Sequence, residues 1–107
     1  MLTLTVKKEW YDKLLSGKKK EEYVKIKPSY TKKFLSAGLL TETVDPIFGS
    51  VVIEPNNSAN WICFKNGYDT ETPSFRALVE VRIGTGNSDW GANPGEQYYI
   101  LHILSIE

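Results

Sequence analysis

The feature that most limits the fold of this chain is the segment 98–106, which is predominantly apolar on both of its alternating faces. Side chains of a strand alternate between two faces, so a strand of this kind needs cover on both sides. We therefore expect it to be a central strand. Combined with several other short strands, it predicts a small closed or nearly closed β-barrel.

Other segments with the two-residue period of a strand occur along the whole chain. They are residues 2–6, 19–27, 61–65 and 75–83. The stretch 39–59 is the least informative, and only a short strand at 51–53 is expected there. The sequence thus predicts five or six strands.

Two segments in the first third of the chain have the period of a helix. The first, residues 7–16, ends before Gly17, a natural C-terminal stop, and has an apolar face made of Trp10, Tyr11, Leu14 and Leu15. The second, residues 29–36, follows Pro28, which favours the first turn of a helix, and should turn Tyr30 and Phe34 inward. Two helices and five or six short strands in 107 residues indicate one domain of the α+β class.

Charge is distributed unevenly along the chain although the formal net charge is zero. Residues 1–33 contain ten lysines and four acidic residues, whereas residues 34–107 contain three basic and nine acidic residues. This asymmetry favours a polyanionic partner. The lysines expected to contact phosphates are Lys7, Lys8, Lys13, Lys18, Lys19, Lys20, Lys25, Lys27, Lys32 and Lys33.

The composition excludes several classes of protein. A single cysteine, Cys63, allows no internal disulfide, and one cysteine with one histidine cannot form a four-ligand zinc site. No apolar run reaches the roughly 20 residues of a membrane-spanning helix. The apolar start of the chain precedes its first lysines, which is the reverse of a signal peptide. We expect a cytoplasmic protein with no cofactor, no metal and no membrane partner.

The segment 16–23 carries the strongest sign of a binding site. A glycine turn, three lysines and two carboxylates follow the first predicted helix within eight residues. Alternation places Glu22 on the inward face with Val24 and Ile26, and a buried carboxylate needs a partner. Lys19 or Lys20 is close enough to provide it. Such a pair orients a ligand or moves a proton, or is a salt bridge that closes one end of the barrel.

The glycine-rich loop 84–95 matches neither a P-loop nor a dinucleotide fingerprint. It is expected to form a flexible rim that presents Trp90. An indole next to Gly91 in a loop is poorly placed for core packing and well placed to stack on a base, although aromatic residues in a small barrel also serve simply to fill the core. His102 and Cys63 are interpreted as core residues.

The order of these motifs resembles the ASCH domain family, which has a PUA-like β-barrel and a Gly-x-Lys turn that leads into the second strand. Here the turn is Gly17-Lys18-Lys19, after a strand and a helix, and it continues into Glu21-Glu22-Tyr23. Further similar segments are residues 62–68, 84–91 and 96–101. The resemblance implies a single ASCH domain over residues 1–107, of the small bacterial or phage type, with little contribution from residues 37–59.

The resemblance implies a cleft between the barrel and its first helices, lined by the Gly-x-Lys turn, that binds RNA or a modified nucleotide. In this reading lysines contact phosphates, an aromatic ring stacks on a base, and a polar side chain reads the base edge. The expected ligand-binding residues are Lys18, Lys19, Lys20, Glu22, Tyr23, Lys65, Asn66, Tyr68 and Trp90.

Two alternatives stay open at the level of sequence. Some small ASCH members look like amidohydrolases of acylated cytidine, which use the lysine of the Gly-x-Lys turn and a threonine three residues later. These positions are Lys19 and Glu22 here, so a carboxylate replaces the threonine nucleophile. In this alternative the chain is a small hydrolase of a modified nucleoside or of RNA, and by a different mechanism Glu22 acts as a base on water while Lys19 polarises a carbonyl. A basic residue that the family often has two positions further on is Val24. The other alternative is a regulatory protein-interaction domain whose basic half docks an acidic partner.

Overall fold

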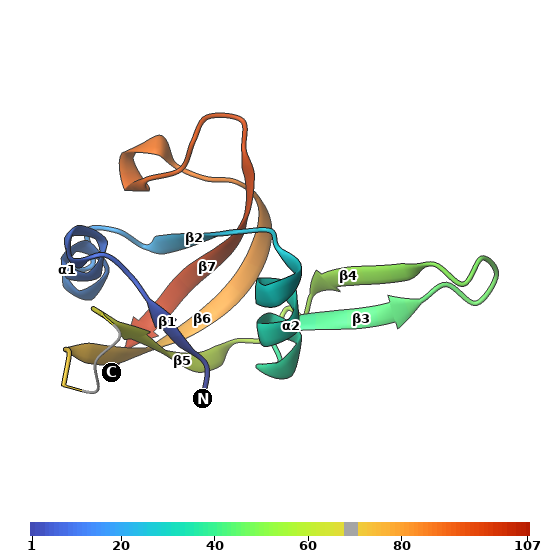
Figure 1. Ribbon diagram of the computed structural model, residues 1–107, viewed down its shortest axis with the longest axis horizontal. Coiled ribbons are helices and arrows are strands. Elements are labelled where there is room, and N and C mark those ends of the chain that lie inside the picture. The colour runs from blue at the N-terminus through green and yellow to red at the C-terminus, as the bar shows by residue number, and fades with distance from the viewer. Residues whose placement is uncertain (68–70) are drawn as a thin grey trace.

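The strands of this chain divide into a curled five-stranded sheet and a two-stranded arm (Figure 1). The structure is a computed structural model that describes residues 1–67 and 71–107. In chain order its elements are β1 (Thr3–Thr5), α1 (Lys8–Ser16), β2 (Glu21–Lys25), α2 (Pro28–Ser36), β3 (Leu40–Val44), β4 (Val51–Pro55), β5 (Asn60–Lys65), β6 (Ser74–Thr85), a 3-10 turn (Ser88–Trp90) and β7 (Gln97–Ile106). The architecture confirms the α+β class.

The curled sheet has the strand order β1-β5-β6-β7-β2. β1 pairs in parallel with β5, with Thr3 opposite Cys63, and the other neighbouring strands are antiparallel. β7 lies between β6 and β2, and its residues 98–101 are buried, which confirms that the segment apolar on both faces is an interior strand. Among the described residues, the edge strands β1 and β2 do not pair with each other. The sheet is therefore an open half-barrel.

The two helices cover the core of this half-barrel. Leu14 of α1 and Phe34 of α2 are fully buried, and they join a core that includes Ile62, Phe64, Val79 and Leu101. Gly17 ends α1 in the left-handed conformation (φ 81°), as the sequence predicts. Within the described part of the chain, neither helix is long and apolar enough to cross a bilayer.

Two apolar residues expected to face inward are exposed. Leu15 of α1 is 46% exposed, because the buried stripe of this short helix is only wide enough for Tyr11 and Leu14. Ile26 is also 46% exposed, although alternation pairs it with the buried Val24. β2 ends one residue earlier, and the chain leaves the sheet there to enter α2.

The arm formed by β3 and β4 is the largest departure from the sequence prediction, which places only one short strand, 51–53, in this region. β3 and β4 pair in antiparallel register from Leu40 opposite Pro55 to Val44 opposite Val51. At the tip, the Asp45 carboxylate accepts hydrogen bonds from two backbone N–H groups of the connecting turn. Figure 1 shows that this arm, residues 40–55, projects away from the curled sheet. Five strands thus form the sheet, within the range expected, and two more form the arm.

Candidate functional site

A pocket of about 540 Å³ lies across the opening of the half-barrel. Its lining comes from both edge strands of the curled sheet, from both helices, from the loop 84–95 and from the start of β7. The residues that give it its chemistry are Lys7, Trp10, Lys19, Glu22, Tyr23, Lys25, Lys27, Tyr30, Lys33, Trp90 and Tyr98. Its volume is that of a small-molecule site.

Lys19 reaches the floor of this pocket because of the way α1 ends. The left-handed Gly17 donates its N–H to Leu14 O at 3.2 Å, and the Lys19 N–H then bonds to Lys13 O at 3.0 Å. These two bonds fold the chain back under the helix before β2 begins. The Lys19 side chain, only 1% exposed, points into the protein, whereas its neighbours Lys18 and Lys20 point to solvent.

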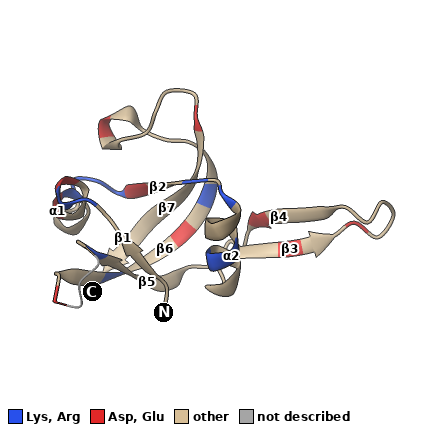
Figure 2. Cartoon of the chain, in the orientation of Figure 1, with Lys and Arg blue, Asp and Glu red and all other residues tan. Residues whose placement is uncertain are grey.

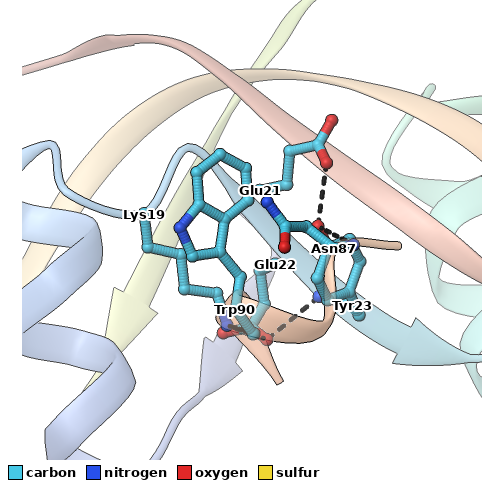
Figure 3. A network of polar contacts seen from close by, with 6 residues as sticks. All are labelled: Lys19, Glu21, Glu22, Tyr23, Asn87 and Trp90. Atoms are coloured by element: carbon cyan, nitrogen blue, oxygen red, sulfur yellow. Dashed lines mark hydrogen bonds and ion pairs between the residues drawn. The ribbon is translucent and has the colours of Figure 1, made fainter. Parts of the chain in front are cut away.

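Three kinds of contact hold the Lys19 ammonium group. Its Nζ donates to the carbonyl oxygen of Trp90 at 2.6 Å and lies 3.4 Å from Glu22 Oε1, as Figure 3 shows. The same nitrogen lies 4.2 Å from the centroid of the Trp10 ring and 5.5 Å from that of Tyr23. A carbonyl, a carboxylate and two aromatic faces therefore compensate for the removal of this charge from water.

Glu22 is the buried partner that the alternation of β2 predicts. Its Oε1 accepts hydrogen bonds from Lys19 Nζ and from the Tyr23 backbone N–H, the latter at 3.0 Å. Its Oε2 is buried as well, but no described residue donates a hydrogen bond to it. Of the two candidate partners, the structure selects Lys19 and leaves Lys20 exposed. Glu22 thus presents one unsatisfied acceptor inside the protein.

Burial changes the protonation of both members of this pair in opposite directions. Removal from water raises the pKa of the Glu22 carboxyl, against the attraction of the Lys19 ammonium. The same removal from water lowers the pKa of Lys19, against the attraction of Glu22. Each group is therefore easier to neutralise than it would be at the surface, which is typical of groups that exchange protons with a ligand.

A second polar network fixes the loop 84–95 above the pocket (Figure 3). The backbone N–H of Asn87 donates to the Tyr23 hydroxyl at 2.9 Å, and this hydroxyl donates to Glu21 Oε1 at 2.9 Å. The other Glu21 oxygen lies 3.4 Å from Nδ1 of His102, a half-buried residue. Burial, followed by the hydrogen bond to Glu21 and against the hydrogen bond from Asn87, raises the pKa of Tyr23 to about 12, so the phenol stays protonated and keeps donating.

Two glycines let the loop approach the aromatic rings of the pocket. A Cβ on Gly86 would lie 2.6 Å from the Tyr23 ring and 2.7 Å from the Ala92 Cβ. Gly91 has φ +98°, and a Cβ there would lie 3.0 Å from the Trp10 ring. Close contact at both points brings the Trp90 carbonyl to Lys19. The loop predicted as a rim is thus anchored on α1 and β2.

Lysines surround the mouth of the pocket. Lys7 precedes α1, Lys25 ends β2, Lys27 precedes α2 and Lys33 lies on α2; all four are exposed and line the pocket. Figure 2 shows that basic residues gather over α1, β2 and α2, whereas all charged residues of the arm are acidic. The cationic half of the sequence is therefore folded around the candidate site.

The structure brings together four of the nine residues that the sequence predicts as ligand-binding: Lys19, Glu22, Tyr23 and Trp90. Four others do not line this pocket: Lys18, Lys20, Lys65 and Asn66. Lys18 and Lys20 are exposed and point outward, whereas Lys65 ends β5, where its carbonyl accepts a hydrogen bond from the N–H of Val6 in the pocket wall. Tyr68 lies outside the described residues.

The sequence pattern predicts Trp10 only on the core-facing side of a helix, whereas in the structure the Trp10 ring lies against the buried Lys19 ammonium group. Its ring is half-buried, with Lys19 Nζ on one side and Lys13 Nζ 5.0 Å from its centroid. A signal was present in the sequence: four apolar residues on so short a helix make a face wider than one core stripe. The residue at the edge of that face is the one that lines the pocket.

No family model matches this chain, and neither a curated protein nor a solved structure matches it significantly. The resemblance to ASCH domains therefore rests on the motifs quoted above and stays a prediction. Chemically, the pocket combines a buried ammonium group, an unsatisfied carboxylate oxygen, two indoles and a cationic rim. These are the groups needed to hold a flat, polar ring that carries a phosphate.

Proposed function

We propose that this chain is an RNA-binding or modified-nucleotide-binding module of the ASCH type with a PUA-like barrel, and that its pocket receives one base. The observation that carries the proposal is the buried Lys19–Glu22 pair, which lies among aromatic side chains in a pocket whose mouth is lined by lysines. Tyr23, Tyr30 and Tyr98 belong to or pack against the hydrophobic clusters of the core, but those clusters include neither the Lys19–Glu22 pair nor Trp10 and Trp90. Together they have the chemistry of a site built for a ligand with a polar edge and two π faces.

The buried pair matches the edge of a nucleobase. An ammonium group has three N–H donors, and the described acceptors of Lys19 Nζ are the Trp90 carbonyl and Glu22 Oε1. The third donor has no described hydrogen-bond acceptor, and the carboxylate that binds the same ammonium group has its Oε2 unsatisfied. Bases carry an acceptor next to a donor on their Watson–Crick edge, and RNA-binding proteins read this edge when a base is unstacked.

The faces and the phosphate of the ligand are served by other groups of the pocket. Trp10 and Trp90 line it from opposite elements, α1 and the loop, and offer indole surfaces for stacking. The rim lysines, of which Lys25 and Lys27 flank the end of β2, supply phosphate contacts. The acidic remainder of the chain repels a polyanion from other surfaces and directs it to this mouth.

The proposal is tested by titrating single-stranded RNA into the protein and following tryptophan fluorescence at several salt concentrations. If Z phosphates are neutralised, log K falls with log salt with a slope of about −0.7Z. Trp90→Ala should weaken binding by about tenfold, because loss of one stacked base costs about 1–3 kcal/mol. A flat salt response, or no binding at low salt, contradicts the proposal.

A matched pair of lysine variants separates the pocket from general surface charge. Lys27 and Lys18 are both exposed, but only Lys27 lines the pocket. Lys27→Ala should reduce the magnitude of the salt slope by about 0.7, the share of one phosphate, whereas Lys18→Ala should leave it nearly unchanged. Equal effects of the two variants would mean that RNA binds to diffuse charge and not to this pocket.

A second candidate function, hydrolysis of an acylated nucleoside, is favoured by the unsatisfied Glu22 oxygen beside Lys19. Glu22 would take a proton from water, the resulting hydroxide would add to the acyl carbon, and Lys19 would stabilise the oxyanion. Collapse of the adduct breaks the C–N bond, and the proton held by Glu22 passes to the departing amine. The products are a carboxylic acid and the free base amine.

Mass spectrometry of acylated cytidine incubated with the protein tests this second function. Turnover by the parent, lost in Glu22→Gln while the circular dichroism spectrum is unchanged, would establish catalysis. RNA binding by the parent without any turnover would leave the binding function and remove the hydrolytic one. Lys18→Ala serves again as the control, because its side chain lies outside the pocket.

A further inference from the structure

The arm, residues 40–55, exposes an unusual amount of apolar surface. Its tip residues Ile47 and Phe48 are 82% and 81% exposed, and three further large apolar side chains in it are at least 40% exposed: Val44, Val51 and Val52. Val44 and Val51 lie opposite each other in the strand register, next to the turn that carries the tip. Exposed apolar side chains gathered on a projecting element mark an interaction site, because monomeric proteins seldom leave much apolar surface to water. The arm therefore requires a partner surface that is itself apolar.

The charges of the arm narrow the choice of partner. Residues 39–60 contain Glu42, Asp45 and Glu54 but no lysine or arginine. Figure 2 shows that the charged residues of β3, β4 and their connection are all acidic. An acidic element is repelled by nucleic acid and by anionic lipid, so the partner is a protein surface with an apolar floor and a basic rim.

This chain carries such a surface. A groove of about 700 Å³ lies between the N-terminus, α2 and β5. Its apolar lining includes Met1 and Trp61, which are 72% and 40% exposed, and its rim carries Lys32 and Lys33. A groove of this volume can receive the side chains of a phenylalanine and an isoleucine, and its charge is complementary to that of the arm.

The positions of groove and tip make the chain complementary to itself. The groove is lined by Ser36, Ala37 and Asn60, which flank the arm in sequence, so it lies at the base of the arm while the apolar tip lies at the far end. When two copies place their arms side by side and antiparallel, each tip meets the groove of the other. This arrangement is a closed twofold exchange, the commonest form of protein dimer.

We propose that two copies of this chain associate by exchanging arms, so that Ile47 and Phe48 of each copy occupy the groove at the base of the other copy's arm. The acidic residues of each arm then lie near Lys32 and Lys33 of the partner copy. Among the described residues, β3 and β4 pair only with each other, so their outer edges are open to each other across the twofold axis.

Sedimentation velocity over a wide range of protein concentration tests the exchange. The parent should show a species of twice the 12.1 kDa mass that dissociates on dilution. Ile47→Ser/Phe48→Ser should be monomeric throughout, with an unchanged circular dichroism spectrum. Leu104→Ser, which removes a 48% exposed apolar side chain on β7, is the control and should dimerise like the parent. A monomeric parent, or a dimer that survives the tip substitutions, overturns the proposal.

A cysteine pair locates the contact independently of stability. In a Cys63→Ser background, Phe48→Cys and Trp61→Cys in the same chain should form a disulfide-linked dimer, because the arm separates the two positions within one copy. Each single cysteine variant should remain uncrosslinked. If the double variant forms dimers that do not crosslink, the interface is a different one.

A charge reversal tests the basic rim of the groove. Lys32→Glu, introduced into the parent, should weaken the dimer because it places a negative charge next to the acidic arm of the partner copy.

Discussion

The pocket across the half-barrel and the arm of β3 and β4 differ in which side chains they bury. The pocket buries charged groups, whereas the arm exposes apolar ones. The pocket buries an ammonium group and a carboxylate, with Lys19 only 1% exposed. The arm exposes Ile47 and Phe48 almost completely. Most of a folded protein follows the reverse distribution, with apolar side chains inside and charges outside.

The difference lies in what each region contributes to the stability of the single chain. Burying charges is unfavourable unless they are paired, so the Lys19–Glu22 pair and the Trp90 carbonyl depend on one another. Removing one member should be costly. The side chains of Ile47 and Phe48 at the tip of the arm are more than 80% exposed, so replacing them with polar side chains should be almost silent in the monomer. Substitutions in the pocket should therefore destabilise the chain most, and substitutions at the tip of the arm should destabilise it least.

The largest effect is expected for Lys19→Met. This variant leaves the Glu22 carboxylate and the Trp90 carbonyl buried without their common donor, and breaking a buried pair costs about 3 kcal/mol or more. Urea denaturation should show this loss in the free energy of unfolding at neutral pH. Lys18→Met, at an exposed neighbouring position, should change it by less than about 0.5 kcal/mol.

Removing both charges should restore most of that stability. In Lys19→Met/Glu22→Gln the uncompensated carboxylate is gone, and a neutral pair of similar volume is often as stable as a buried ion pair. RNA binding should still be lost, because the Lys19 donor to the base edge is missing and a neutral carboxamide replaces the Glu22 carboxylate. A double variant as unstable as Lys19→Met alone would show that packing, and not charge, dominates at this site.

A smaller loss of about 2 kcal/mol is expected for Gly86→Ala, which forces a methyl group against the Tyr23 ring and the Ala92 Cβ. Thermal or urea denaturation measures it, and RNA binding should weaken because the loop and Trp90 shift. Gly84→Ala is the matched control, since its Cβ would meet nothing closer than Ile100 Cδ1 at 3.8 Å. Equal effects of the two substitutions would contradict the anchoring of the loop.

A weaker effect is expected in the pH dependence of stability. Burial raises the pKa of Glu22 above its ordinary 4.5, so the folded state binds more protons than the unfolded state between that value and the folded pKa. The contribution of Glu22 to stability is therefore present at lower pH and is lost as pH rises through this window. Unfolding free energies of the parent and Glu22→Gln, compared over pH, should reveal this component in the parent only. A parent that gains stability relative to the variant on raising the pH would reverse the sign and refute the assignment.

The smallest effect is expected for Ile47→Ser/Phe48→Ser measured on the monomer at low concentration. Because both side chains are more than 80% exposed, the free energy of unfolding should change by less than about 0.5 kcal/mol. Denaturation at low and at high protein concentration separates this result from the loss of the dimer. A large loss in the monomer would mean that the tip packs on its own chain.

Local patterns in the sequence predicted the part of the molecule where one face is buried. The alternation of β2 placed Glu22 inside, Gly17 ended α1, and the segment 98–101 lies in an interior strand. The place of Trp90 in a glycine-rich loop predicts that it binds a ligand, and in the structure Trp90 lines the same pocket as Lys19.

The rest escaped prediction for physical reasons. Apart from Leu40 and Ile53, the residues of β3 and β4 stand clear of the core, so most of them are exposed on both faces and leave no apolar alternation to read. Trp10 lies on the core side of α1, and only tertiary packing decides that its ring meets Lys19. Whether the sheet closes depends on how β1 and β2 are placed in space, which no local pattern encodes.

The parallel pairing of β1 with β5 has a consequence for the order of events during synthesis. Thr3 pairs with Cys63, so β1 waits during synthesis for a partner made some sixty residues later. Leu4, Thr5 and Val6 form one wall of the pocket. A nascent chain that has already completed both helices and the Lys19 turn therefore still lacks that wall, and the site is assembled only when the last strands arrive.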